Sequence, residues 1–409
     1  MHIVIVSDAE LGGGAAICAA RLAAALVRKG RRVTRLVRVA SGEGHPWTTR
    51  VFGEPGPAGL ARRVGRKLGW IDEAATRVRQ TNRQLTKELE ALRPDIINLH
   101  NLHWDLGTGW TPALAEICQG QAPTVWTLHD MWSFTGRCAY SWACRKYLTG
   151  CDATCPTPTE YPALEPARIA GAWRQRTDLL QRCTRLRAIT PSRWLAAEAQ
   201  AGLWRARQVD VIPNGLPLEV YKPLDKQMAR AALEIATHGP VLLVSGNKVS
   251  EPMFAALRGA SWPAATLLVM GRGVVPALGP RIRVQRLGYI DQERMKVLAY
   301  NAADMFIHYA SMDNLPNVVM ESIACGTPVV GAPGGGVPEM VREGVTGWLS
   351  REVTVASYQE TLARAANDWA RGVDLRGSCR AVAENEYAEA RQAQRYGTLF
   401  EEMHRLTGR

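Results

Sequence analysis

The chain has 409 residues, and its length, composition and charge exclude several classes of protein. This length exceeds one ordinary hydrophobic core, so two or three domains of roughly 150 residues each are expected. Hydrophobic residues make up 46% and charged residues 22%, as in globular proteins, and no apolar run reaches the roughly 18 residues of a membrane span. Met1–Asp8 lacks the basic segment and the long apolar run of a signal peptide, so a cytoplasmic location is expected.

The chain is basic, with a net charge of +12 and an isoelectric point near 9.5. Basic residues cluster at Arg28–Arg32 and Arg62–Lys67. Solvated helix ends and loops explain most such clusters, whereas attraction to nucleic acid, an anionic membrane surface or a phosphate-bearing substrate is the sharper interpretation. Because no zinc-finger spacing, RNP motif or helix-turn-helix pattern is present, a membrane or phosphate partner is favoured over nucleic acid.

Strands and helices alternate along the chain. His2–Val6 is predicted to be a buried strand, and the turn Gly12-Gly13-Gly14 leads into a helix from about Ala15 to Lys29, ended by Gly30. Further strands are predicted at Val33–Val37, Ile96–Leu99, Thr124–Leu128, Leu186–Ile189, Val209–Ile212, Val241–Val244, Thr266–Val269, Met305–His308 and Val329–Gly331. Helix-length segments separate most of them, which indicates βαβ units and parallel sheets buried on both faces.

A proline- and glycine-rich connector, Pro213–Pro217, marks a domain boundary. We therefore predict an N-terminal domain at 1–213, a C-terminal domain at 218–384, and a C-terminal helix at 385–409 that packs back toward the N-terminal domain. The expected fold class is α/β, with two Rossmann-like, doubly wound domains facing a cleft. Such domains bind ligands at the carboxyl ends of their strands.

The stretch from Met312 to Glu339 carries the most information about function. A loop precedes a helix that begins near Pro316 or Asn317 and stops at Gly326, and the unpaired N–H groups of such a helix start suit a pyrophosphate. Glu321 suits the two hydroxyls of a ribose, and Asp313 suits hydroxyls of a transferred sugar. The turn Gly334-Gly335-Gly336 is expected to let the backbone approach a ligand. The donor-binding residues predicted here are Asn314, Leu315, Pro316, Asn317, Val318 and Glu321.

This block resembles the acid-x7-acid signature of retaining glycosyltransferases of family 4 with the GT-B fold. These enzymes usually have Glu at both ends; Glu321 matches, whereas the first acid here is the shorter Asp313. The resemblance implies a catalytic role for Asp313. It also implies transfer from a nucleotide-diphosphate sugar with retention of configuration, without a metal or other cofactor in the reaction.

The resemblance extends to the N-terminal half. Gly13 and Gly14 are similar to the family's glycine loop, which approaches the donor phosphates. The segment Thr-Leu-His-Asp-Met-Trp at 127–132 resembles the bacterial exopolysaccharide and colanic-acid subgroup, and it implies that His129 is catalytic and lies beside the donor sugar. The acceptor side is predicted to contain His100, His103 and Asp130. The three histidines could also indicate a metal, but the family needs none, so the acceptor-side interpretation is preferred.

One segment departs from the family pattern. A Gly-Arg-x4-Lys-Gly motif normally supplies two cations to the donor pyrophosphate, whereas this chain has Ser245–Pro252, with Asn247 at the Arg position and no Lys-Gly. Lys248 or Arg272 is predicted to take over that role.

Four of the nine cysteines, Cys138, Cys144, Cys151 and Cys155, lie close together in sequence. A cytoplasmic chain rarely keeps disulfides, so the two interpretations are a structural zinc held by four thiolates and a loop of free thiols. The spacing is not that of a zinc ribbon, and both interpretations stay open.

The predicted function is transfer of a sugar from a UDP, GDP or ADP sugar to a hydroxyl of a saccharide or lipid-linked saccharide in polysaccharide or glycoconjugate synthesis. The anionic inner face of the cytoplasmic membrane is a possible partner, and nucleic acid is not. The alternatives are a non-catalytic protein that binds nucleotide sugars, and an epimerase or phosphorylase on the same fold. A nicotinamide-dependent oxidoreductase is disfavoured because Gly12–Ile17 lacks the last glycine of the dinucleotide fingerprint.

Overall fold

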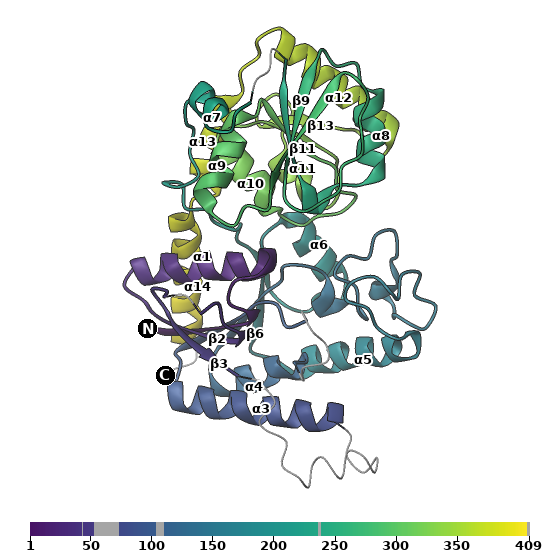
Figure 1. Cartoon of the computed structure of the whole chain (residues 1–409). Helices are drawn as coiled ribbons and strands as arrows, with labels where there is room; N and C mark the ends of the chain where they lie inside the picture. The colour runs from purple at the N-terminus through teal and green to yellow at the C-terminus, as the bar shows by residue number, and fades with distance from the viewer. Residues whose placement is uncertain (43, 53–72, 104–109, 236–238, 407–409) are drawn as a thin grey trace, which may run out of the picture. The chain divides into compact units, whose positions relative to one another are not determined.

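The computed structural model describes residues 1–42, 44–52, 73–103, 110–235 and 239–406. The chain forms two compact units, the first made of Met1–Ile212 with Gln392–Arg409 and the second of Pro213–Arg391. Each unit contains one parallel β-sheet with helices beside it (Figure 1). The predicted fold class, two Rossmann-like α/β domains, is confirmed.

Unit 1 contains a seven-stranded sheet within the described residues, in the order β3-β2-β1-β4-β5-β6-β7, and every neighbouring pair is parallel. The central strands β1, β4 and β5 are buried along their whole length, as apolar runs in a parallel sheet require. The elements are β1 (His2–Ala9), α1 (Gly13–Arg28), β2 (Arg32–Val39), β3 (Thr48–Val51), α3 (Glu73–Leu92), β4 (Ile96–Leu99), α4 (Ala113–Gln121), β5 (Thr124–Thr127), α5 (Pro166–Arg182), β6 (Leu186–Thr190), α6 (Arg193–Ala201) and β7 (Val209–Val211).

The last helix, α14 (Glu389–Leu406), completes the core of unit 1. Its side chains Tyr396 and Phe400 are buried in the same apolar cluster as Ile3 and Ile5 of β1 and the alanine-rich face of α1. The small residues of α1 let this helix lie close to the sheet. The chain thus begins and ends in one folded unit, although α14 starts among the residues of unit 2.

Unit 2 contains a six-stranded parallel sheet in the described part of the chain, ordered β10-β9-β8-β11-β12-β13. Buried aliphatic and aromatic side chains from its strands and helices form one continuous core. The elements are α7 (Lys226–Ala232), β8 (Val241–Ser245), α8 (Glu251–Gly259), β9 (Ala265–Met270), β10 (Ile282–Gly288), α9 (Glu293–Ala302), β11 (Met305–His308), α10 (Asn317–Ala324), β12 (Val329–Gly331), α11 (Val337–Met340), β13 (Gly347–Leu349), α12 (Val355–Ala370) and α13 (Arg376–Glu386).

The order of strands reverses once in each sheet, between β1 and β4 in unit 1 and between β8 and β11 in unit 2. Parallel strands place all their carboxyl ends at one edge, and a crevice opens where successive connections diverge. In doubly wound sheets ligands bind beside the loops that follow such strands. The loops after these four strands contain many of the residues singled out from the sequence.

Candidate active site

In unit 2 an ion pair joins the loops that follow β8 and β11. Lys248 lies in a short 3-10 turn after β8, and its Nζ is 3.0 Å from Oδ2 of Asp313. The Asp313 side chain is 10% exposed, whereas that of Lys248 is 50% exposed. The other carboxylate oxygen, Oδ1, accepts the backbone N–H of Asn314 at 2.9 Å. Two predicted donor-site residues, far apart in sequence, thus meet at the point where the strand order reverses.

The glycine turn after β12 holds the Asp313 loop in place. The backbone N–H of Gly336 donates to the carbonyl oxygen of Asp313 at 2.8 Å, and Gly335 adopts a φ of +68°. A Cβ on Gly335 would lie 2.2 Å from that oxygen, and one on Gly334 would lie 2.4 Å from the carbonyl oxygen of Ser311. The sequence analysis expected this turn to approach a ligand. In the structure the close approach of this turn is to the chain's own backbone around Asp313, and its approach to a ligand stays a prediction.

Glu321 is buried in α10, a helix that begins at Asn317 as predicted. The hydroxyl of Tyr300, from α9, donates to Oε2 of Glu321 at 3.0 Å. Burial, followed by the Glu321 charge, raises the pKa of Tyr300 well above its ordinary value, so the phenol remains a neutral donor. One carboxylate oxygen is therefore fixed by the fold. Of the other residues predicted from this block, Asn314, Leu315 and Pro316 are buried, and Asn317 and Val318 are partly exposed.

A histidine at the end of β11 lies close to the Lys248–Asp313 ion pair. The sequence analysis gave it no role. His308 is 2% exposed, and its Nε2 has no hydrogen-bond partner in the described part of the chain. Burial lowers its pKa to about 4, with opposing influences from Asp313, which raises it, and Lys248, which lowers it. The ring is therefore neutral near pH 7. As the last residue of an apolar strand, it gave no motif signal.

The two cations predicted to replace the missing Arg are placed differently. Lys248 contacts Asp313, whereas the guanidinium of the exposed Arg272 stacks on the ring of Tyr289, 4.7 Å from its centroid. The backbone N–H of Arg272 donates to Oδ1 of Asn247 at 3.5 Å, so the loops after β8 and β9 are neighbours. Lys248 is thus the cation that the structure brings to the predicted donor residues.

In unit 1 the structure brings the four predicted acceptor-side and catalytic residues together as two pairs. His100 follows β4 and His129 follows β5, and Nδ1 of His100 is 2.8 Å from Nε2 of His129. His103 Nε2 is 2.9 Å from Oδ2 of Asp130. Burial lowers the pKa of His129 to about 4, with Asp130 opposing this effect, and burial together with His129 lowers the pKa of His100 well below its ordinary value. Both rings of the first pair are therefore neutral near pH 7.

These residues close around a small cavity. His103 Nδ1 is 3.1 Å from the Tyr161 hydroxyl, and the His103 ring lies 4.9 Å from the ring of Trp132. The cavity lined by the two histidine pairs has a volume of about 10 Å³, which is room for about one water molecule. A sugar that reaches His129 must therefore bind at the rim of this cavity.

The glycine loop of unit 1 lies at the same edge of the sheet. Gly13 is the first residue of α1 and has a φ of 77°, in the left-handed region that favours glycine, and Gly14 follows it in the helix. The helix begins two residues earlier than the sequence predicts. Both predicted glycines are therefore at the amino end of α1, next to the carboxyl end of β1.

A buried charged cluster beside this loop escaped the sequence analysis. The Glu10 carboxylate accepts hydrogen bonds from the Ser41 backbone N–H at 2.8 Å, the Trp47 indole at 2.9 Å and the Thr49 hydroxyl. Burial alone would raise its pKa, but hydrogen bonds from Thr49, Ser41 and Trp47 lower it to about 2. The fully buried Arg35 donates to the carbonyl oxygen of Glu10 at 2.8 Å. The sequence did contain one sign of this buried cluster, namely an arginine inside the mostly apolar strand at 33–37.

The four clustered cysteines share one irregular region after β5. Burial raises the pKa of Cys138 to about 12 and that of Cys151 to about 11, and in each case the neighbouring thiols of the cluster add to the rise. The Sγ atom of Cys151 accepts the backbone N–H of Gly136 at 3.2 Å. Within the described residues, no group of three or more His, Cys, Asp or Glu side chains is arranged to hold a metal ion.

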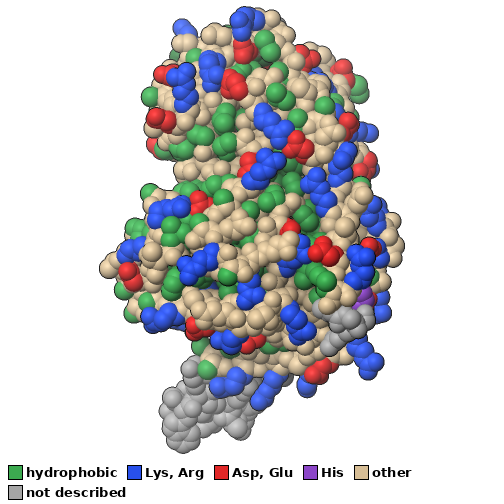
Figure 2. All heavy atoms as spheres, turned by 180° about the vertical axis from the view of Figure 1, so that it is seen from behind, with side chains coloured by type: hydrophobic (Ala, Val, Ile, Leu, Met, Phe, Trp, Pro, Cys, Tyr) green, Lys and Arg blue, Asp and Glu red, His purple; other side chains and the backbone are tan. Residues whose placement is uncertain are grey.

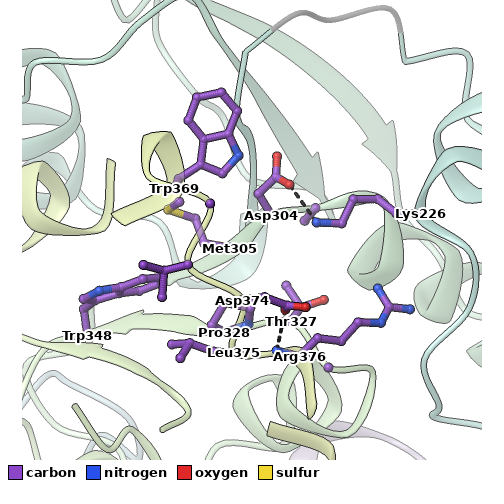
Figure 3. A pocket seen from close by; sticks show the side chains of 14 residues that line it. Lys226, Asp304, Met305, Thr327, Pro328, Trp348, Trp369, Asp374, Leu375 and Arg376 are labelled. Carbon is purple, nitrogen blue, oxygen red and sulfur yellow. Dashed lines mark hydrogen bonds and ion pairs between the residues drawn. The ribbon is translucent and has the colours of Figure 1, made fainter. Parts of the chain in front are cut away.

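Unit 2 contains a cavity at the edge of its sheet opposite the Lys248–Asp313 pair (Figure 3). Its volume is about 340 Å³, and it lies at the amino ends of β11 and β12, opposite the edge that carries the Lys248–Asp313 pair. Trp348 and Trp369 lie on one side of it, and an ion pair of 2.8 Å between Lys226 and Asp304 on another. This cavity is separate from the donor-site residues.

The face shown in Figure 2 carries its positive charge in dispersed form. On the face shown in Figure 2, Lys and Arg side chains are interspersed with acidic and uncharged ones. In the first basic cluster Arg31 pairs with Glu401, and the second, Arg62–Lys67, lies outside the described residues. None of the helices in the described ranges is both long enough and apolar enough to cross a membrane.

Comparisons with known proteins agree with this fold. Sucrose-phosphate synthase from Thermosynechococcus elongatus superposes with a TM-score of 0.71 at 18% identity, covering 98% of each chain. HepE from Anabaena, solved in complex with UDP-glucose, gives a TM-score of 0.64 at 19% identity over 98% of this chain and 100% of that one. Identities this low show a shared fold.

Two relatives identified by sequence have names that state an activity. WcaC of Escherichia coli, named for glycosyl transfer in colanic acid biosynthesis, is 24% identical over 65% of this chain and 66% of its own length, slightly under two thirds. A D-inositol 3-phosphate glycosyltransferase of Segniliparus rotundus is 28% identical over 76% of this chain and 69% of its own. Both relatives are named as glycosyltransferases.

Two family models match the chain. Glycosyltransferase Family 4 matches residues 12–220, more than half of the chain, and the model of Glycosyl transferases group 1 matches residues 267–386. The chain therefore belongs to glycosyltransferase family 4. The unusual segment Ser245–Pro252 falls between the two matched ranges.

Proposed function

We propose that the chain transfers a sugar, with retention of configuration and without a metal ion, from a nucleotide-diphosphate sugar to a hydroxyl of a saccharide or lipid-linked saccharide. The Lys248–Asp313 ion pair carries this proposal, because it unites a cation and a sugar-binding acid at the point where the strands of unit 2 diverge.

The donor half is assigned to unit 2. Glu321, fixed by Tyr300, binds the ribose hydroxyls. Lys248 and the start of α10 stabilise the negative charge that develops on the departing nucleoside diphosphate, as preorganised donors and cations do. Asp313 binds hydroxyls of the sugar ring. UDP is the first nucleotide to test, because HepE was solved with UDP and with UDP-glucose.

The acceptor half is assigned to unit 1. His129, His103 and Asp130 line the small cavity, and His129 is assigned the contact with a hydroxyl of a substrate. Asp130 is engaged by His103 and by the backbone N–H of Trp132 at 2.9 Å, so it is not placed as a nucleophile. Retention of configuration is therefore assigned to attack by the acceptor hydroxyl on the same face of the donor sugar from which the nucleoside diphosphate departs.

Three measurements test these assignments. Thermal shifts with UDP, GDP and ADP should show one nucleotide that raises the melting temperature by linkage. With the matching nucleotide sugar, release of nucleoside diphosphate should depend on acceptor and persist in EDTA, and NMR of the product should show the donor's anomeric configuration. Inversion would refute the stereochemical assignment, and loss of activity in EDTA would refute metal independence.

A second candidate, a protein that binds nucleotide sugars without transferring them, is favoured by one observation. Asn247 stands where the family has Arg, in a segment outside both family matches. Under this alternative a nucleotide would still stabilise the protein, but no acceptor would release nucleoside diphosphate.

We also propose that basic residues of unit 1, among them those at Arg28–Arg32, attract the anionic membrane that carries a lipid-linked acceptor. The relation to WcaC, which its name places in colanic acid synthesis, supports such an acceptor. Co-sedimentation with vesicles should rise with the fraction of phosphatidylglycerol and fall with salt, as electrostatic attraction does. Equal binding to neutral vesicles would refute this part.

For the cysteine cluster we propose a structural zinc, whose positive charge would offset the repulsion among four thiolates. Zinc coordination requires these side chains to be arranged differently from their placement in the structure. Metal analysis should find about one zinc per chain, lost in Cys151→Ser and kept in the control Cys118→Ala, a buried thiol elsewhere in unit 1. A zinc-free protein with titratable thiols would support the free-thiol interpretation instead.

A further inference from the structure

A buried chain of hydrogen bonds runs from His129 into the core of unit 1. His129 bonds to His100 at 2.8 Å, and Nε2 of His100 lies 2.9 Å from Oδ1 of Asn98. Nδ2 of Asn98 donates to the Thr127 hydroxyl at 2.9 Å, and that hydroxyl lies 3.0 Å from the hydroxyl of Tyr396. Asn98, Thr127 and His100 are almost wholly buried. The sequence analysis gave a role to the two histidines and none to the residues behind them.

The orientation of the Asn98 amide is fixed by its neighbours. Besides the Thr127 hydroxyl, its Nδ2 faces the carbonyl oxygens of Val125 at 3.3 Å and of Leu99 at 3.4 Å. Carbonyl oxygens accept hydrogen bonds and cannot donate them, so the amide group turned toward them must be the NH2. Oδ1, which only accepts, is therefore the atom presented to His100.

This orientation sets the protons on both rings. Because Oδ1 accepts, His100 must carry a hydrogen on Nε2, and in its neutral form Nδ1 then has the lone pair. The His100–His129 hydrogen bond needs one donor, so Nε2 of His129 supplies the hydrogen. In neutral His129 the lone pair is then on Nδ1.

Both rings are in the neutral form to which this argument applies. Burial, then the charge of His129 and that of Arg35, lowers the pKa of His100. Burial also lowers the pKa of His129, with His103 acting in the same direction and Asp130 opposing. Among the described residues, the Arg35 guanidinium acts on the pKa of His100, and His103 and Asp130 act on that of His129.

We propose that Asn98 acts as a positioning residue that sets the tautomer of His129 through His100, so that Nε2 of His129 carries the hydrogen and Nδ1 has the lone pair. The proposal deepens the function proposed above and rests on it for the role of His129. It distinguishes this ring from one with a hydrogen on Nδ1: under the proposed function, a substrate hydroxyl that reaches Nδ1 donates a hydrogen bond to it. The hydroxyl of Tyr396, on α14, anchors the far end through Thr127.

The tautomers are measured directly by ¹⁵N NMR of the histidine rings in the full chain at neutral pH, without substrate. Both His129 and His100 should show a pyrrole-type Nε2 bearing hydrogen and a pyridine-type Nδ1. A hydrogen on Nδ1 of either neutral ring overturns the proposal. This readout does not depend on activity: the predicted tautomers together with no transfer from any donor would sink the proposed function alone.

A variant then tests the role of the amide. Asn98→Leu keeps the branching at Cγ but removes the acceptor, so His129 should show mixed tautomers and kcat should fall at least about tenfold, a part of what a positioned proton acceptor contributes, with the KM for the donor unchanged. Asn301→Leu is the matched control: Asn301 is a buried amide of α9 that donates to two backbone carbonyls in unit 2. It should lose stability and keep the tautomers and kcat.

Two further outcomes complete the test. A single unchanged His129 tautomer in folded Asn98→Leu would overturn the proposal. If that variant does not fold, the spectrum of the unaltered protein still decides, and Tyr396→Phe, which removes the far anchor and leaves Asn98 Oδ1 in place, should retain both tautomers.

Discussion

Replacing Lys248 by Met separates a role in binding the donor from a role in folding. The Lys248 side chain is half exposed, so its ion pair with Asp313 is worth at most about 1 kcal/mol of stability. A hydrogen bond to a charged group, such as a donor phosphate, is worth about 1.5–3 kcal/mol. At about 1.4 kcal/mol per tenfold change, Lys248→Met should weaken nucleoside diphosphate binding roughly 10- to 100-fold with little change in stability.

The assay is calorimetric titration with the nucleotide that stabilises the protein best. The affinity for the nucleoside monophosphate should change less than that for the diphosphate, because the lost contact is with the pyrophosphate. Lys226→Met is the matched control, since Lys226 makes a similar ion pair with Asp304 at the other edge of the same sheet. Equal diphosphate affinity in Lys248→Met and the unaltered protein would refute the assignment.

Three further changes test other parts of the structure. Gly335→Ala places a Cβ 2.2 Å from the Asp313 carbonyl oxygen at a φ of +68°, so it should cost about 1–3 kcal/mol, read as a lower melting temperature; an unchanged value would contradict the role of this turn as a tight backbone contact. Because the pKa of Glu10 is depressed from 4.5 to about 2, its contribution is fully present above pH 4.5 and is lost as the pH falls toward 2. That amounts to about 3 kcal/mol. In urea unfolding, the free energy of unfolding should fall less between pH 7 and pH 3 in Glu10→Gln than in the unaltered protein, and an equal fall would contradict this role of Glu10. His129→Ala should lower kcat about 10²- to 10⁴-fold while nucleotide affinity, measured in the same titration, stays the same; retained turnover would remove His129 from the mechanism.

The sequence predicts the central strands well and the edge strands poorly. Ile96–Leu99, Met305–His308 and Val329–Gly331 have the predicted bounds because strands buried on both faces are continuous apolar runs. The strands β3, β10 and β13 are not predicted. All three lie at sheet edges. β3 and β10 expose much of their length and β13 has only 3 residues, so none of them contains an apolar run that the sequence would reveal.

The candidate site is predictable in its parts and less so in its connections. The acid-x7-acid spacing locates Asp313 and Glu321, and strand ends locate His100 and His129. No spacing indicates that Tyr300 fixes Glu321, because that contact depends on how α9 packs against α10.

Long-range hydrogen bonds are the least predictable part. The bond between Thr127 and Tyr396 joins residues 269 apart in sequence. The carboxylate of Glu10 is held by Ser41, which follows β2, and by Thr49 of β3. Polar residues of this kind look like ordinary surface positions until the fold buries them.

The most direct test of the account is acceptor-dependent release of nucleoside diphosphate. The purified chain is supplied with UDP-, GDP- and ADP-sugars and a lipid-linked saccharide acceptor, beside His129→Ala. The account predicts release from one donor, only when acceptor is present, together with glycosylated product, and near-complete loss in the variant. Nucleotide binding without release under all these conditions, or an epimerised sugar with no release, would contradict it.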